Sequence, residues 1–272
     1  MPPLPASNAS SARPVALVTG GARRIGRSIA LELAAHGHDI ALHHRGPATE
    51  PDLQHTLEAI RRVGVRAEPL QAELADEAQC SALVPAAVAR FGRLDAVVNN
   101  AARFEDDSVF DFGFAEMEAH WRANTAPALI LARELHAHLL ARGAGAAQGC
   151  VVNLLDQKLW NPNPDHISYT LSKAALEAAQ TLLAQALAPL VRVCGVAPGV
   201  TMPSGPMDAA EFELAHRLTP LERSSTPADV ARAVRFLIES PAITGTTLLV
   251  DGGQHLLKQP RDVLHIVRSK QP

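Results

Sequence analysis

The chain has 272 residues, enough for one large α/β domain, and its formal charge of −3 is nearly balanced. Without a long basic run, the composition gives no argument for nucleic-acid binding. No apolar run approaches the roughly 20 residues that cross a bilayer. Three widely separated cysteines show no metal-type spacing and are typical of a reducing compartment. We therefore expect a cytoplasmic protein with no metal, no membrane and no nucleic-acid partner.

Strands and helices are predicted to alternate along the chain. Strands are expected at residues 15–18, 39–44, 65–71, 94–99, 150–155, 191–197 and 246–250. Helical spacing covers residues 25–35, 51–63, 77–91, 116–142, 168–190 and 227–240. This order predicts an α/β fold: a single-domain, Rossmann-type, doubly wound parallel sheet of about seven strands with helices on both faces.

The domain is expected to cover residues 14–257, including its substrate site. Residues 1–13 are rich in Pro, Ser and Ala and lack the basic start and apolar core of a signal peptide, so we expect a disordered arm. Residues 258–272 are expected to form a polar C-terminal tail.

A glycine turn, Thr19 to Gly26, joins the first strand to the first helix. Glycines let the backbone approach a pyrophosphate and the helix start offers free N–H groups, although a tight connection alone has the same pattern. The second strand ends in His43, His44 and Arg45 rather than in the acidic residue that binds the ribose of NAD. Arg24 and Arg45 favour the 2′-phosphate of NADPH, unless both are ordinary surface arginines. The two histidines are expected to pack at the strand end.

Tyr169 and Lys173 lie four residues apart at the start of a helix, on one face. A nearby ammonium should lower the pKa of the phenol from about 10, which would allow proton exchange near neutral pH. The segment Asn99 to Ala102 follows the fourth strand, at the edge where open sheets bind ligands. Phe104, in the next loop, could stack on a flat substrate or pack in the core.

Together with Asn124, Pro198-Gly199 and Asp251-Gly252-Gly253, these motifs resemble the short-chain dehydrogenase/reductase superfamily over about residues 14–257. The resemblance implies that Tyr169 is the catalytic acid, that Lys173 holds the nicotinamide ribose and that Asn124 supports a water-mediated proton path. It also implies a homotetramer built through the helices at 116–142 and 168–190, which carry extra apolar positions. The implied cofactor contacts are Gly20, Arg23, Arg24, Ile25, Gly26, His44, Arg45, Glu73, Leu74, Asn100, Ala101, Ala102, Tyr169, Lys173, Pro198, Gly199, Val200 and Thr201.

Two residues depart from the usual superfamily pattern: Arg24 replaces a turn glycine, and Asp156 replaces the catalytic serine. Both departures, with an aromatic at Phe104, are similar to the pteridine reductases and the bacterial dihydromonapterin reductases. The resemblance implies NADPH-dependent reduction of a small-molecule pterin, stacked by Phe104 against the nicotinamide. Asp156 would then relay protons to Tyr169, or it would only cap a turn. The implied substrate contacts are Phe104, Asp156, Trp160, Tyr169 and Met202.

Two other functions stay open from the sequence. One is a general carbonyl or 3-oxoacyl reductase of the same superfamily. The other is a non-catalytic NADP(H)-binding protein, which the missing serine at Asp156 would explain. Intact Tyr169, Lys173 and Asn124 argue against the second, because a protein that only binds the cofactor has little use for a tuned phenol.

Overall fold

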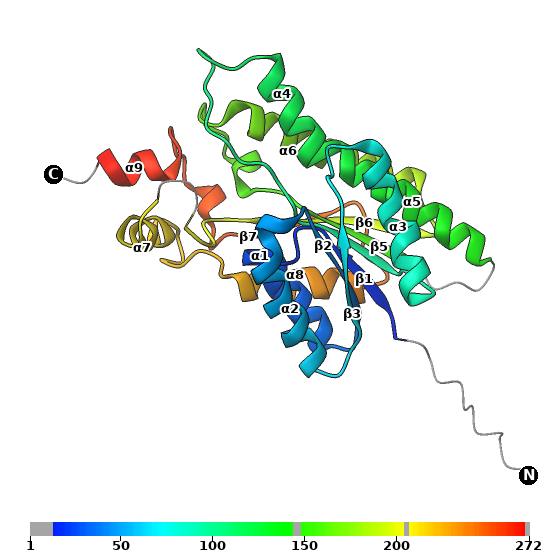
Figure 1. The fold of residues 1–272 in the computed structure, drawn as a ribbon. Coiled ribbons are helices and arrows are strands. Elements are labelled where there is room, and N and C mark those ends of the chain that lie inside the picture. Colours follow the sequence, from blue (N-terminus) through cyan, green and yellow to red (C-terminus); the bar gives the residue numbers. More distant parts are fainter. Residues whose placement is uncertain (1–12, 144–147, 204–206, 270–272) are drawn as a thin grey trace, which may run out of the picture.

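The computed structural model describes residues 13–143, 148–203 and 207–269. Its strands form one parallel sheet in the order β3-β2-β1-β4-β5-β6-β7 (Figure 1). They are β1 Val15–Val18, β2 Asp39–His44, β3 Ala67–Gln71, β4 Ala96–Asn99, β5 Gly149–Leu154, β6 Val191–Pro198 and β7 Thr247–Val250. The order reverses between β1 and β4, and ligands bind outside the carboxyl ends of strands at such a switch point. The predicted doubly wound fold is confirmed.

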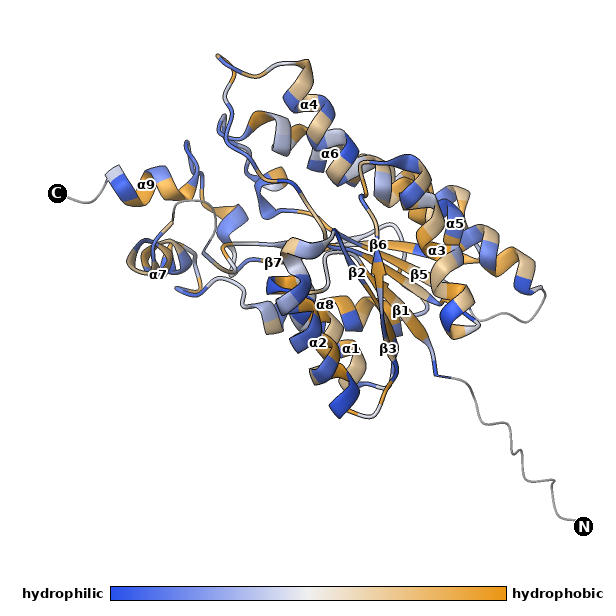
Figure 2. Ribbon diagram, viewed as in Figure 1, coloured by the Kyte–Doolittle hydropathy of each residue, from blue (hydrophilic) through white to orange (hydrophobic). Residues whose placement is uncertain are grey.

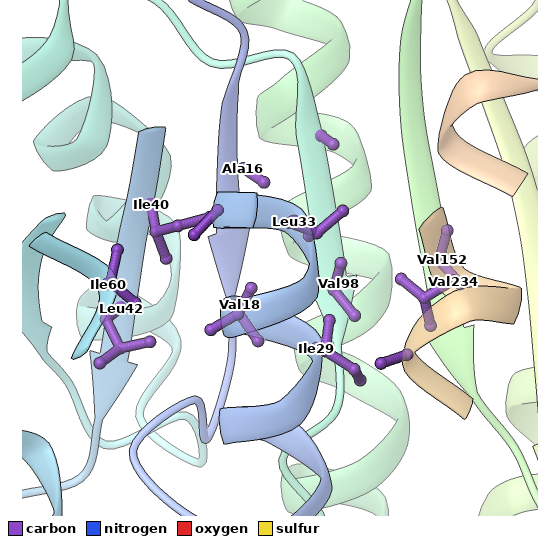
Figure 3. Close-up of a cluster of buried hydrophobic side chains, with 14 of the residues drawn as sticks. Ala16, Val18, Ile29, Leu33, Ile40, Leu42, Ile60, Val98, Val152 and Val234 are labelled. Carbon is purple, nitrogen blue, oxygen red and sulfur yellow. The ribbon is translucent and has the colours of Figure 1, made fainter. Parts of the chain in front are cut away.

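Three helices cover each face of the sheet. On one face lie α1 Arg24–Ala35, α2 Glu50–Arg62 and α8 Pro227–Glu239, and on the other lie α3 Glu77–Phe91, α5 Ala126–Arg142 and α6 Ile167–Ala186. Because the sheet is buried on both faces, its strands are almost continuously apolar, whereas the helices keep a hydrophilic outer side (Figure 2). Figure 3 shows how strand residues such as Val18 and Val98 meet Ile29 of α1 and Val234 of α8.

Shorter elements surround the carboxyl edge of the sheet. They are η1 Pro47–Thr49, α4 Phe114–His120, the π-helical turn η2 Trp121–Thr125, η3 Gln157–Trp160, α7 Ala209–Arg217, η4 Gln254–Leu256 and α9 Val263–Ser269. The helix expected at 116–142 is therefore α4, η2 and α5 in succession. A π-turn inside a helix frequently marks a functional site.

The segment expected to be a polar tail contains α9. This helix packs on α7, where Val263 and Val267 form a small apolar cluster with Ala215. Seven residues are too few for a helical period to be recognised, so this helix cannot be predicted from sequence. The expected N-terminal arm lies outside the described residues except for Arg13.

The described part of the chain contains no helix that is long and apolar enough to cross a membrane. It also contains no group of three or more His, Cys, Asp or Glu side chains that could hold a metal ion. Its cysteines, Cys80, Cys150 and Cys194, are free and buried.

Candidate active site

The glycine turn lies against the end of β2 and is fixed there by His43. The Gly20 amide donates to His43 Nδ1 at 3.0 Å, so this nitrogen carries no proton and Nε2–H faces the Ala72 carbonyl at 3.1 Å. Burial lowers the pKa of His43 to about 4, which keeps the ring neutral. A Cβ atom at Gly26 would lie 2.3 Å from the Gly20 carbonyl oxygen, so the turn requires glycine there. His43 thus packs at the strand end, as predicted, and shapes the turn.

The Asn99 to Ala102 segment is tied to the same turn through Thr19. The amides of Asn100 and Ala101 donate to Thr19 Oγ1 at 2.9 and 3.0 Å. Asn100 Nδ2 donates to the Thr19 carbonyl at 2.9 Å. These bonds join the ends of β1 and β4 across the switch point, where doubly wound sheets bind dinucleotides.

The two arginines predicted to share a phosphate extend toward different parts of the sheet. Arg24 donates to the Pro203 carbonyl at 2.7 Å, beyond β6. Arg45 is 79% exposed and lies 3.8 Å from Glu73, beyond β3. The backbone of Arg24 has φ +54°, the left-handed region that favours glycine, which explains why glycine is usual at this position. Arg45 is therefore placed beside the end of β2, whereas Arg24 belongs to the cavity described below.

The catalytic candidates converge where β5 ends and α6 begins. The Tyr169 hydroxyl donates to Asp156 Oδ2 at 2.8 Å, and Asp156 Oδ1 accepts from the Lys158 amide at 2.9 Å. Lys173 Nζ donates to the Leu154 carbonyl at 2.6 Å and lies 5.9 Å from the centre of the Tyr169 ring. Asp156 thus caps η3, and it also accepts the hydrogen bond from the phenol that the predicted relay requires.

The predicted lowering of the phenol pKa is wrong for this structure. Burial and the adjacent Asp156 carboxylate raise the pKa of Tyr169 well above 10. The ammonium of Lys173 does not offset this, because it faces a backbone carbonyl rather than the hydroxyl. Burial also raises the pKa of Asp156 and lowers that of Lys173 to about 8. The phenol therefore keeps its proton at neutral pH and is arranged as an acid.

Asn124 lies in the π-turn η2 and uses its side chain to join two parts of the site. Its Oδ1 accepts from the Arg103 amide at 2.7 Å, while Nδ2 donates to the Arg103 carbonyl at 3.0 Å and to Ser172 Oγ at 2.9 Å. These contacts hold the loop that carries Phe104 against α6. The water-mediated proton path that the resemblance implies for Asn124 stays a prediction.

Phe104 stands at the mouth of the site rather than in the core. Its ring is 40% exposed, with its centroid 4.8 Å from that of Tyr169 at 90° and 4.4 Å from that of His166. One side of the ring is thus supported by protein, as a stacking surface for a flat substrate requires.

A cavity of about 270 Å³ opens above the carboxyl ends of β4, β5 and β6. Of the predicted residues it brings together Arg24, Ile25, Asn100, Ala102, Phe104, Asp156, Tyr169, Lys173, Pro198, Gly199, Val200, Thr201 and Met202. Other predicted cofactor residues lie outside this lining, along the glycine turn and the ends of β2 to β4: Gly20, Arg23, Gly26, His44, Arg45, Glu73, Leu74 and Ala101. Trp160, expected at the substrate, is 39% exposed and not part of the lining.

Sequence reasoning missed one wall of the cavity. This wall comes from η3, the start of α6 and the C-terminal segment, and includes Gln157, Lys158, Asn163, His166, Gln254, Gln259, Asp262, Val263 and Leu264. These residues come from separate segments of the chain, and hydrogen bonds from Arg261 and Asp262 to Asp165 tie the segment before α9 to the loop between η3 and α6. Sequence spacing carries no signal for these contacts.

The switch-point turn, the buried Tyr–Lys pair and the cavity define a dinucleotide-dependent oxidoreductase. A family model described as enoyl-(acyl carrier protein) reductase matches residues 20–255. The chain belongs to the short-chain dehydrogenase/reductase family, as the sequence predicted, and as a member it is an oxidoreductase that uses NAD(P)H.

Similar proteins include reductases of different substrates. The solved structure of FolM alternative dihydrofolate reductase 1 from Brucella suis in complex with NADP is 38% identical, with a TM-score of 0.84 over 92% of this chain and 98% of that chain. Pteridine reductase 1 from Leishmania tarentolae is 34% identical over 92% of this chain and 99% of its own length. The 3-oxoacyl-[acyl-carrier-protein] reductase FabG from Staphylococcus aureus is 32% identical over 89% and 98%, respectively.

Proposed function

We propose that this protein reduces a pterin or dihydropteridine with NADPH, with Tyr169 as the proton donor. The observation that carries the proposal is the 2.8 Å hydrogen bond from the Tyr169 hydroxyl to the Asp156 carboxylate. A hydroxyl at this position would suit a ketone oxygen, which only accepts hydrogen bonds. A carboxylate suits a substrate whose ring nitrogens and amino group donate. The similarity to an alternative dihydrofolate reductase solved with NADP and to a pteridine reductase supports this choice.

The residues present fit a dinucleotide cofactor. The glycine turn and the free N–H groups at the start of α1 suit the pyrophosphate, and Arg45 suits a 2′-phosphate. Lys173 and Pro198 to Thr201 line the cavity beside the catalytic tyrosine, where they would hold the nicotinamide and its ribose. NADPH, when bound, supplies the hydride.

Tyr169 and Asp156 supply the proton that accompanies the hydride. Reduction of a C=N bond adds hydride to carbon and a proton to nitrogen, so the donor must be protonated when the substrate arrives. The raised pKa of Tyr169 keeps its proton in place, and the raised pKa of Asp156 favours proton uptake from solvent and transfer to the phenol. Asp156 is thus the relay and Tyr169 the donor.

The proposal is tested by following NADPH oxidation with a substrate panel. Dihydromonapterin, dihydrobiopterin and dihydrofolate are compared with simple ketones and a 3-oxoacyl thioester. We expect kcat/KM for at least one pterin to exceed that for every ketone by about tenfold or more, which corresponds to about 1.4 kcal/mol of transition-state binding. Turnover of ketones alone contradicts the proposal.

A 3-oxoacyl or carbonyl reductase is the second candidate, favoured by the 32% identity to the Staphylococcus aureus FabG. If it is correct, Asp156→Ser should raise ketone turnover, and pterins should not compete with the ketone. A third candidate, a non-catalytic NADP(H)-binding protein, would bind NADPH and turn over no member of the panel.

We also propose a cytoplasmic homotetramer that assembles through α5 and α6. Leu140, Leu171 and Leu182 on these helices are exposed, which supports an interface there. A monomer in light scattering at micromolar concentration contradicts the tetramer. The free, buried cysteines are consistent with a reducing compartment.

A further inference from the structure

The C-terminal segment is held over the cavity by a buried carboxylate, Asp165. Its oxygens accept from Arg261 Nε at 2.9 Å and from the Asp262 amide at 2.5 Å. Gln254 Nε2 donates to Gln259 Oε1 at 3.1 Å and adds a second attachment. This segment therefore forms a fixed wall of the cavity, and its side chains are part of the candidate substrate site.

Lys158 is a buried cation in the same wall. It is 5% exposed, lines the cavity and donates from Nζ to the Asp165 carbonyl at 2.5 Å. An ammonium has three donors, and no other acceptor for this one is found within the described residues. Burial lowers the pKa of Lys158, and the charge of Asp262 opposes this lowering more than that of any other carboxylate. A buried ammonium with unused donors facing a cavity points to a ligand.

Two unused acceptors face the cavity beside Lys158. Asp262 is half-buried, and its Oδ1 accepts from the Leu264 amide at 3.0 Å, while no donor for its other oxygen is found among the described residues. Gln157 is buried, and its Oε1 has no hydrogen-bond partner in the part of the chain that the structure describes. The wall thus offers both a donor and acceptors with no partner from the protein.

We propose that Lys158 and Asp262 form a donor–acceptor pair that binds a hydroxyl group on the substituent of the substrate and thereby sets specificity. The inference rests on the proposed function, because it concerns the part of the pterin outside the reacting ring. A hydroxyl donates to a carboxylate and accepts from an ammonium, so one group satisfies both partners. An anionic substituent would be repelled by the carboxylate of Asp262. An apolar substituent would leave both Lys158 and Asp262 without a partner, which weakens binding.

The test compares two dihydropterins that differ in their substituent, with kcat/KM measured for each. Dihydromonapterin carries hydroxyl groups, and 6-methyl-7,8-dihydropterin carries none. For the unchanged protein we expect a ratio of about 10 to 100 in favour of the hydroxylated substrate, because buried polar groups left unpaired penalise the other. Asp262→Ala and Lys158→Met should each lower this ratio about fivefold or more.

The ratio of the two kcat/KM values distinguishes loss of hydroxyl recognition from a general disturbance of the fold. A variant that merely disturbs the site lowers both rates together and leaves the ratio as it was. Asp262→Asn keeps an oxygen for the Leu264 amide but loses the charge, so it should also lower the ratio, whereas Lys258→Met, an exposed lysine in the same segment, should not.

Either of two results overturns the assignment while leaving the proposed function intact: a wild-type ratio near one, or ratios that the Asp262 and Lys158 variants do not change. Failure of the unchanged protein to reduce either pterin would instead refute the proposed function itself, and the assignment with it.

Discussion

Replacement of Asp156 tests the part assigned to this side chain in proton delivery. In Asp156→Ala the Tyr169 hydroxyl loses a buried, charged acceptor at 2.8 Å, and the Lys158 amide loses its acceptor at 2.9 Å. A hydrogen bond to a charged group contributes about 1.5–3 kcal/mol, which corresponds to a factor of about 10 to 150 in rate. We expect kcat for the best pterin to fall by about this factor, while the Kd for NADPH changes less than about threefold.

Asp156→Asn is the matched control for structure. Asparagine can still accept from the Lys158 amide and from the phenol, but it cannot take up and pass on a proton. If the carboxylate is a relay, Asp156→Asn should lose most of the pterin activity that Asp156→Ala loses. Single-turnover kinetics with saturating NADPH and circular dichroism separate the chemical step from folding. Full pterin turnover by Asp156→Ala would refute the reasoning.

Three further predictions follow from the geometry. Arg45→Ala should lower the preference for NADPH over NADH, measured as the ratio of kcat/KM values, by about tenfold. An unchanged ratio would show that Arg45 does not bind the 2′-phosphate. The pKa of Lys173 is lowered to about 8 chiefly by burial, so kcat/KM should fall as the pH rises through about 8, where the ammonium loses its charge. Because the Asp156 charge raises that pKa, the fall should move to lower pH in Asp156→Asn, and a move to higher pH would contradict the arrangement. Leu131→Ala should lower the free energy of unfolding by about 2–5 kcal/mol in urea titrations, since Leu131 is fully buried in α5, and a loss under about 1 kcal/mol would show that the core there is loosely packed.

Most of the sheet could be predicted because its strands are buried on both faces. Val15–Val18 is continuously apolar and Asp39–His44 has an apolar centre at residues 40–42, and both strands lie where the sequence predicts them. Strands β3 and β4 begin at Ala67 and Ala96, two residues after their predicted starts, since the buried apolar residues Val65 and Leu94 precede them. Helix α9 could not be found, because its seven residues span too few turns to show a helical period.

In the site, too, residues in local motifs could be predicted, whereas contacts between distant segments could not. Tyr169 and Lys173 could be identified because they share one helix turn, and Asp156 could be identified because it stands where the superfamily that the chain resembles usually has its catalytic serine. The direction of the Tyr169 pKa could not, since it depends on whether the hydroxyl meets Asp156 or Lys173, and the spacing of four residues is compatible with both. Lys158 and Asp262 are over one hundred residues apart in the sequence, and each donates a hydrogen bond to Asp165.

The most direct test of the central claim is to follow the transferred hydride into a pterin. The protein is incubated with dihydromonapterin and NADPH that carries deuterium at the transferable C4 position, and the product is analysed by mass spectrometry. We expect a tetrahydropterin that contains one deuterium and whose rate of formation falls in Asp156→Ala. A product without deuterium, or no tetrahydropterin while a 3-oxoacyl thioester acquires the label, would contradict it.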